Sequence, residues 1–211
     1  MTDSLSDGPL LACLERAREL GYLGPGPIDR HIEQGVGFGE ALELRLPQVI
    51  TAPLRIVDLG SGGGVPGLVL LRRWPLSQWL FLDTNQRRMA TLRSAVAELD
   101  AAHRAEVVCG RAEDEVPPRR GRFDAVVARG FGPPAVTAEC AAPLLATGGL
   151  LVVSEPPEDR SRWDPVGLAT LGLAGDVLTA GGFRFFVATQ DVPCAQRFPR
   201  RLGIPAKRPL F

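Results

Sequence analysis

The residues with the clearest chemical potential lie between Asp58 and Gly67, where the sequence reads DLGSGGGVPG. A strand that turns sharply into a helix while its backbone touches a ligand has no room for Cβ atoms at the tightest points, so glycines gather there. Residues 62–67 also fit the spacing G-x-G-x-x-G of loops that bind dinucleotide phosphates. The segment therefore predicts a loop that holds a nucleotide-like ligand.

Two acids help to distinguish the kinds of ligand. Asp58 precedes the glycines, where a carboxylate can hold the ammonium group of S-adenosylmethionine (SAM), often through water, whereas dinucleotide loops usually lack an acid there. Asp83 ends the next apolar run, where an acid accepts hydrogen bonds from both ribose hydroxyls in SAM and NAD sites alike. We expect SAM, with Ser61 and Gly62 among its contacts. A dinucleotide site and a turn without ligand are the alternatives.

Two further segments follow the third and fourth apolar runs. The sequence GRAE at residues 110–113 would offer a backbone amide and the carboxylate of Glu113 to the adenine edge of the cofactor. The alternative is that Glu113 is a solvated acid in a loop. Arg129 ends the fourth run, at the edge of an open α/β sheet where ligands bind. We expect Arg129 to contact cofactor or substrate as the catalytic residue. An ion pair at the sheet edge is the alternative.

Alternating apolar runs and amphipathic segments would position these groups. Between Leu54 and Gln190 they predict βα units on a mostly parallel sheet with helices on both faces, an α/β Rossmann-like fold of SAM-dependent methyltransferases. Apolar residues recur at helical spacing in Gln86–Leu99, and a helix is expected to start at Leu68. The predicted strands are Leu54–Leu59, Trp79–Asp83, Ala105–Cys109, Ala125–Ala128, Leu150–Ser154 and Phe183–Thr189.

Turns and ends complete this outline. Thr147–Gly149 is expected to lead into the fifth strand, and Leu10–Leu20 to form a helix before a Gly/Pro-rich connection. We divide the chain into an N-terminal helical extension (1–45), a SAM-binding domain (46–192) and a basic C-terminal arm (193–211). In the arm, five cations lie among Pro199, Pro205 and Pro209 without an acid between them, a composition that favours an extended arm. An arm that packs back on its own domain, with its arginines paired to surface acids, is the alternative.

Composition narrows the classes of protein. The 211 residues suffice for one sizeable core, and 24 basic residues balance 24 acidic ones, so any affinity for nucleic acid must come from a local patch. The four cysteines are widely spread and only two histidines accompany them, so we expect no metal site. No signal peptide or apolar stretch of membrane-spanning length is found, which predicts a cytoplasmic protein with reduced thiols.

The segments described above, in this order, resemble the bacterial ribosomal RNA small-subunit methyltransferase G family (RsmG/GidB), also called glucose-inhibited division protein B. The resemblance runs from about Arg30 to the C-terminus. Its last motif is the most diagnostic, because a generic methyltransferase has no reason to end in this way. The matching segments are RHI (30–32), GSGGGVPG (60–67), LD (82–83), GRAE (110–113), AR (128–129) and PRRLGIPAKRPL (199–210).

The resemblance implies transfer of a methyl group from SAM to N7 of a guanine in 16S ribosomal RNA. It implies SAM contacts at Gly60, Val65, Ala112, Glu113 and Arg129. Guanine N7 carries a free lone pair at neutral pH, so methyl transfer needs no general base. Positioning of the two reactants is therefore expected to supply most of the rate enhancement. The expected partner is 16S RNA or the small ribosomal subunit, bound by a monomer. The expected RNA-binding cations are Arg200, Arg201, Lys207 and Arg208.

The chain also departs from the family pattern. The region before His31 is short, the Asp-Ser pair expected after His31 is absent, and Ser154-Glu155 stands where a Lys-Gly is expected. An acid in place of a cation disfavours binding of a polyanion. Two alternatives therefore stay open: a divergent paralogue that binds SAM without methylating ribosomal RNA, and a methyltransferase for a small molecule.

Overall fold

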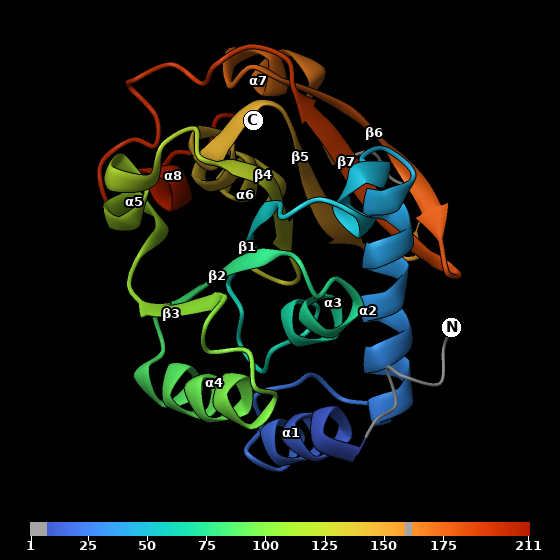
Figure 1. The fold of residues 1–211 in the computed structure, drawn as a ribbon. Helices are drawn as coiled ribbons and strands as arrows, with labels where there is room; N and C mark the ends of the chain where they lie inside the picture. The colour runs from blue at the N-terminus through green and yellow to red at the C-terminus, as the bar shows by residue number, and fades with distance from the viewer. Residues whose placement is uncertain (1–7, 159–161) are drawn as a thin grey trace.

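A seven-stranded sheet runs through the computed structural model, which describes residues 8–158 and 162–211 (Figure 1). The strand order is β3-β2-β1-β4-β5-β7-β6. The first five strands are parallel, and β7 is antiparallel to both β5 and β6. The strands are β1 (Arg55–Leu59), β2 (Gln78–Asp83), β3 (Ala105–Cys109), β4 (Phe123–Ala128), β5 (Leu145–Glu155), β6 (Leu173–Ala180) and β7 (Phe183–Gln190).

Helices cover both faces of this sheet, each over its own buried apolar cluster (Figure 1). One face is covered by α1 (Gly8–Glu19), α2 (Ile28–Glu43), α3 (Gly67–Arg73) and α4 (Gln86–Glu98). The other is covered by α5 (Ala112–Glu115), α6 (Pro134–Ala141) and α7 (Pro165–Thr170), and the short α8 (Ile204–Lys207) packs on α6. The predicted fold class is confirmed.

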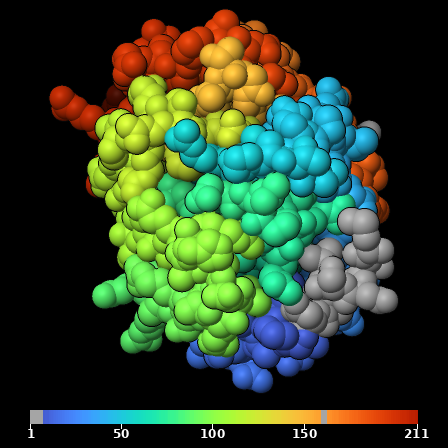
Figure 2. Space-filling view, in the orientation of Figure 1, coloured from blue at the N-terminus to red at the C-terminus, as the bar shows by residue number. Residues whose placement is uncertain are grey.

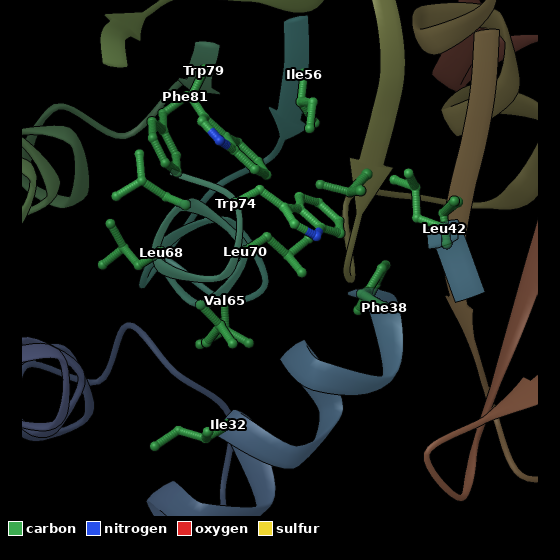
Figure 3. Close-up of a cluster of buried hydrophobic side chains, with 14 of the residues drawn as sticks. Ile32, Phe38, Leu42, Ile56, Val65, Leu68, Leu70, Trp74, Trp79 and Phe81 are labelled. Atoms are coloured by element: carbon green, nitrogen blue, oxygen red, sulfur yellow. The ribbon is translucent and has the colours of Figure 1, made fainter. Parts of the chain in front are cut away.

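The alternation of side chains along β1 explains the two-sided core. Ile56 belongs to one apolar cluster, whereas Val57 and Leu59 belong to the other, because successive residues of a strand point to opposite faces. Both faces of a central parallel strand are buried, so apolar residues of β1 face both clusters, and Asp58 near its end is a buried acid. Figure 3 shows α3 at the centre of the first cluster, with Leu68 and Leu70 among side chains from α2, β1 and β2.

The six predicted strands are present, and the helices predicted at 10–20 and 86–99 correspond to α1 and α4. The turn expected at Thr147–Gly149 lies inside β5 instead of before it. There the pairing moves from Phe123–Leu145 to Ala125–Leu150, so residues 146–149 form a bulge in a strand that starts earlier.

The elements that the sequence did not predict include one strand and one long helix. The edge strand β6 is mostly exposed and contains Gly175 and Asp176, residue types that are rare in strands. Helix α2 contains Gly35, Gly37 and Gly39, which lower helix propensity. The structure shows why glycine is needed: a Cβ at Gly35 would lie only 2.8 Å from Cβ of Val69 on α3. Close packing of two helices outweighs the propensity penalty.

Residues 8–45 pack on the same sheet as the rest of the described chain, with α2 in contact with α3, β5, β6 and β7. The three-part division of the chain therefore stays a prediction. Among residues 8–158 and 162–211, no helix is both long and apolar enough to cross a membrane.

Candidate cofactor and substrate site

A cavity of about 750 Å³ opens where the carboxyl ends of β1 to β5 meet, the edge at which open α/β sheets bind ligands. Its floor is the glycine loop between β1 and α3. One wall comes from the connection after α1 and from α2, and the opposite wall from α5, α6 and α8. The residues that line the cavity include Tyr22, Gly24, His31, Gln34, Gly60, Ser61, Gly62, Val65, Asp83, Ala112, Glu113, Arg129, Phe131, Ser154, Gly203 and Ala206.

The glycine loop is fixed by hydrogen bonds from within. The hydroxyl of Ser61 donates to the Asp58 carbonyl oxygen at 2.8 Å and accepts from the Leu82 N–H at 3.0 Å. Helix α3 begins at Gly67, where a Cβ would collide with the Asp58 carboxylate and the ring of Phe81. Glycine is therefore required where the helix starts directly over the buried acid.

Asp58 lies beneath the cavity rather than on its surface. Its side chain is buried, with 1% of the residue exposed, and Oδ2 accepts a hydrogen bond from the Gly67 N–H at 3.0 Å. Oδ1 is buried without a partner among the described residues. Burial raises the pKa of Asp58 to about 7, although the Gly67 N–H and the charge of Arg129 act in the opposite direction. The carboxyl group therefore has unused capacity to accept a hydrogen bond.

Asp83 and Glu113 do reach the cavity surface. Asp83 Oδ2 accepts from the Gly62 N–H at 3.0 Å and Oδ1 accepts from the Asn85 N–H at 2.8 Å, so the carboxylate is held from both sides. Each oxygen keeps a lone pair for a ribose hydroxyl. Glu113 lies in the first turn of α5, and its Oε1 accepts from the Gly203 N–H at 3.2 Å. The C-terminal arm is thus tied to the cavity wall.

Arg129 follows β4 and extends toward helix α2. Its Nη1 lies 3.0 Å from Nδ1 of His31 and donates to Oε1 of Gln34 at 3.0 Å. His31 Nε2 in turn lies 3.0 Å from the carbonyl oxygen of Gly24. Burial lowers the pKa of Arg129, and the negative charge of Asp58 opposes that effect. Four residues from three parts of the chain therefore form one connected group on the cavity wall.

The C-terminal arm folds back onto the domain instead of extending freely. Glu139 on α6 has a completely buried side chain, and the Arg200 guanidinium pairs with both of its oxygens, at 2.6 Å for the shortest contact. The backbone N–H of Arg200 donates to the same carboxylate at 2.8 Å. A buried carboxylate needs such a partner, so α6 anchors the arm. In Figure 2 the red C-terminal segment lies against the yellow-green segment that contains α5, and α8 of the arm contacts α6.

The cations expected to bind RNA divide into two groups. Arg201, Lys207 and Arg208 are exposed, and their side chains have no hydrogen-bond or ion-pair partner among the described residues. Arg200 is engaged by Glu139, and 26% of its side chain remains exposed. Their binding to RNA stays a prediction, and Arg200 has a structural role that its sequence context did not reveal.

The acid after the fifth strand is neutralised. Glu155 has only 2% of its side chain exposed, and both of its oxygens accept from Arg162, at 2.7 and 3.2 Å. The sequence suggested that an acid here disfavours a polyanion. The ion pair reduces the expected repulsion of a polyanion, because Arg162 balances the negative charge of Glu155 and lies nearer to solvent.

The structure brings together eight of the nine predicted cofactor residues on the cavity surface, and the ninth, Asp58, lies below it. Their contact with the cofactor stays a prediction. The sequence did not point to Tyr22, Gly24, Gln34 or Phe131. Gln34 could have been found from its spacing of three residues after His31, had α2 been predicted. Within the described ranges, no three side chains of His, Cys, Asp or Glu gather closely enough to hold a metal ion.

Comparison with known proteins agrees with this arrangement. Residues 43–159 match the model of the GidB family, described as rRNA small subunit methyltransferase G. Two relatives carry the name ribosomal RNA small subunit methyltransferase G. The protein from Prochlorococcus marinus is 34% identical over 75% of this chain and 68% of its own length. The protein from Moorella thermoacetica is 30% identical over 81% and 75%.

Similarity to solved structures supports the fold. A methyltransferase from Geobacter sulfurreducens superposes with a TM-score of 0.62 over 87% of this chain and 90% of that protein, at 16% sequence identity. The predicted cofactor, SAM, and the predicted class of enzyme, a methyltransferase, are confirmed by the family match together with this fold. With the family model covering more than half of its residues, the chain belongs to the rRNA small subunit methyltransferase G (GidB) family.

Proposed function

We propose that this protein transfers the methyl group of SAM to N7 of a guanine in 16S ribosomal RNA. The observation that carries the proposal is the position of the C-terminal arm. Its residues Gly203 and Ala206 form part of the cavity wall, and its cations Arg201, Lys207 and Arg208 are exposed beside them. Phosphates bound by these cations would hold an RNA strand next to the cavity.

The residues of the cavity fit SAM. Its volume of about 750 Å³ lies in the range of small-molecule sites. Asp83 can accept hydrogen bonds from the ribose, Glu113 lies where the adenine edge is expected, and the unpartnered Oδ1 of Asp58 can accept from an ammonium group through water. When bound, SAM would supply an activated methyl group on a sulfonium centre.

The chain's own contribution is orientation. Guanine N7 is already a nucleophile, so no side chain has to remove a proton before methyl transfer. Arg129 reaches the cavity from the end of β4, and its planar fork suits guanine O6 or a neighbouring phosphate. Phe131 lies on the same wall and offers an apolar ring beside it. We propose that the protein acts as a monomer, because these groups all come from one chain. We also propose that it acts in the cytoplasm, where small subunits assemble.

The test is a methyl-transfer assay with radiolabelled SAM. The substrates are naked 16S RNA, small subunits from a strain that lacks its own enzyme of this class, and an extract of small metabolites. Label in N7-methylguanine of 16S RNA is the expected result. Binding of SAM without labelled RNA would favour the divergent paralogue, and label only among the metabolites would favour the small-molecule enzyme.

A further inference from the structure

His31 holds Arg129 in a way that depends on the protonation of the imidazole ring. The carbonyl oxygen of Gly24 can only accept a hydrogen bond, so Nε2 of His31, 3.0 Å away, must carry a hydrogen. The guanidinium of Arg129 can only donate, so Nδ1 of His31, also 3.0 Å away, must present its lone pair. The two neighbours together select the neutral ring with its hydrogen on Nε2.

The partners of Arg129 are unusual because both are uncharged. Nη1 has two hydrogens, and these account for its contacts with His31 and Gln34. Nη2 and Nε have no hydrogen-bond partner among the described residues. Neither nitrogen is buried, because Arg129 lines the cavity. The two acceptors on α2 therefore aim the remaining donors of the fork at whatever occupies the cavity.

The surroundings of His31 favour its neutral form. The residue is 7% exposed, and burial lowers the pKa of the ring, with further lowering by the charges of Arg129 and of Arg18 on α1. The hydrogen bond to Gly24 acts in the opposite direction. Gln34, on the same helix, has no charge to add. Asp58 is the nearby group that could titrate in the same range, and it acts on Arg129 rather than on His31.

We propose that His31 is a positioning residue for methyl transfer: its neutral Nδ1 holds Arg129 in the orientation that the reaction uses, and its protonation releases that side chain. A proton on Nδ1 replaces the lone pair with an N–H that faces another donor, and it places two cations in contact. The proposal rests on the proposed function and adds a pH dependence to it. Methyl transfer by the wild-type protein should fall on acidification.

The decisive variant is His31→Asn. Its side-chain oxygen can stand near the position of Nδ1 and accept from Arg129, but it does not titrate. His31→Ala removes the acceptor. His103→Asn is the matched control, because His103 is the only other histidine of the chain and is exposed at the opposite edge of the sheet. Thermal unfolding at pH 8 checks that each variant is folded.

Two measurements from pH 4.5 to 8.5 test the proposal: the rate of methyl transfer to 16S RNA, and SAM affinity by calorimetry. His31→Ala should lose about 10- to 100-fold in rate at pH 8, the effect of losing a hydrogen bond to a charged group. His31→Asn should keep most of the rate at pH 8 and lose the acid decline, whereas His103→Asn should follow the wild type.

The outcomes separate this proposal from the proposed function. If the wild type methylates RNA and His31→Asn declines on acidification as steeply as the wild type, Asp58 or the substrate causes the decline and the role of His31 is overturned. If the wild type methylates no RNA, the proposed function fails. The calorimetric measurement then tests the role of His31 by itself. At each pH, the affinity of the wild type for SAM is divided by the affinity of His31→Asn, because titration of SAM itself affects both proteins equally. A ratio that falls at low pH supports the positioning role, and a constant ratio contradicts it.

Discussion

At Asp58, the burial that raises the pKa of the carboxyl group also costs folding free energy once that group ionises. Its pKa is about 7 in the folded protein and ordinarily 3.8. Between these values the folded chain binds more protons than the unfolded chain. The carboxyl group therefore stabilises the fold most fully below about pH 4, and this stabilisation is lost as the pH rises through 7. A neutral side chain of the same shape should avoid that loss.

Asp58→Asn is accordingly expected to raise the free energy of unfolding relative to wild type. The gain should grow from pH 4.5 to pH 8 and reach at most on the order of 4 kcal/mol. Urea denaturation at a series of pH values measures it. The matched control is Asp191→Asn, an exposed acid away from the cavity. A gain that does not change with pH would show that burial does not perturb Asp58.

Asp83 has a different role, because its carboxylate is held at the cavity surface by two backbone N–H groups. Asp83→Ala should weaken SAM binding by about 1.5–3 kcal/mol through the loss of hydrogen bonds from the ribose hydroxyls. Isothermal calorimetry with the purified protein measures this change. Asp191→Ala serves as control, and an unchanged affinity in Asp83→Ala would remove this residue from the site.

At the scale of elements, the attachment of the C-terminal arm to α6 depends on one buried ion pair. Arg200→Ala would leave Glu139 as an unpaired carboxylate with no exposed side-chain surface, at a cost of about 3–5 kcal/mol. The loss should be largely recovered in the double variant Glu139→Gln/Arg200→Ala. Urea denaturation compares the two. Equal destabilisation in both would mean that the arm is anchored by its apolar contacts instead.

The exposed cations of the arm should act on RNA alone. Replacing Arg201, Lys207 and Arg208 by alanine is expected to weaken RNA binding and to lower the slope of log affinity against log salt by roughly 0.7–0.9 for each phosphate that is no longer neutralised. SAM affinity should stay unchanged. Filter binding at several salt concentrations measures the slope. The control is Arg55→Ala/Arg122→Ala, which removes exposed charge at the opposite edge of the sheet. An equal effect per charge in the control would exclude a specific role for the arm.

The elements that the sequence predicted share a strong local signal. The strands β1 to β5 are apolar runs bounded by turns, and α4 has an apolar stripe with an Asn85 cap at its start. Helix α2 lacked such a signal because its glycines serve close packing against α3 and against the strands β6 and β7, a requirement that exists only in three dimensions. The group around Arg129 was missed for the same reason, since His31 and Gln34 face it only once α2 is formed.

Ion pairs set a second limit on prediction. Glu155 and Arg162 are seven positions apart in the sequence, while Arg200 and Glu139 are separated by 61 positions. Local patterns do not specify such partners. Arg200 therefore resembled its exposed neighbours in sequence, and Glu155 resembled an uncompensated acid. Asp83 and the glycine loop were predictable because a short turn after a strand fixes their surroundings locally.

At the scale of the whole molecule, the cavity wall joins residues from Tyr22 to Ala206, so ligand binding should be coupled to global unfolding. SAM at 100 times its dissociation constant is expected to raise the free energy of unfolding by about 2.7 kcal/mol. Urea denaturation with and without SAM tests this coupling. NADH at the same concentration is the control, and stabilisation by NADH instead of SAM would favour the dinucleotide alternative.

The span of the cavity also has a consequence for the order of synthesis. The glycine loop and Asp83 leave the ribosome long before Gly203 and Ala206, which must be present before the wall beside Glu113 exists. A nascent chain can therefore form β1 to β4 and still lack a complete binding site. Contacts between residues so distant in sequence also form late in folding, because closing long loops is entropically costly. An unfinished copy thus lacks part of the surface that encloses the cavity in the finished enzyme.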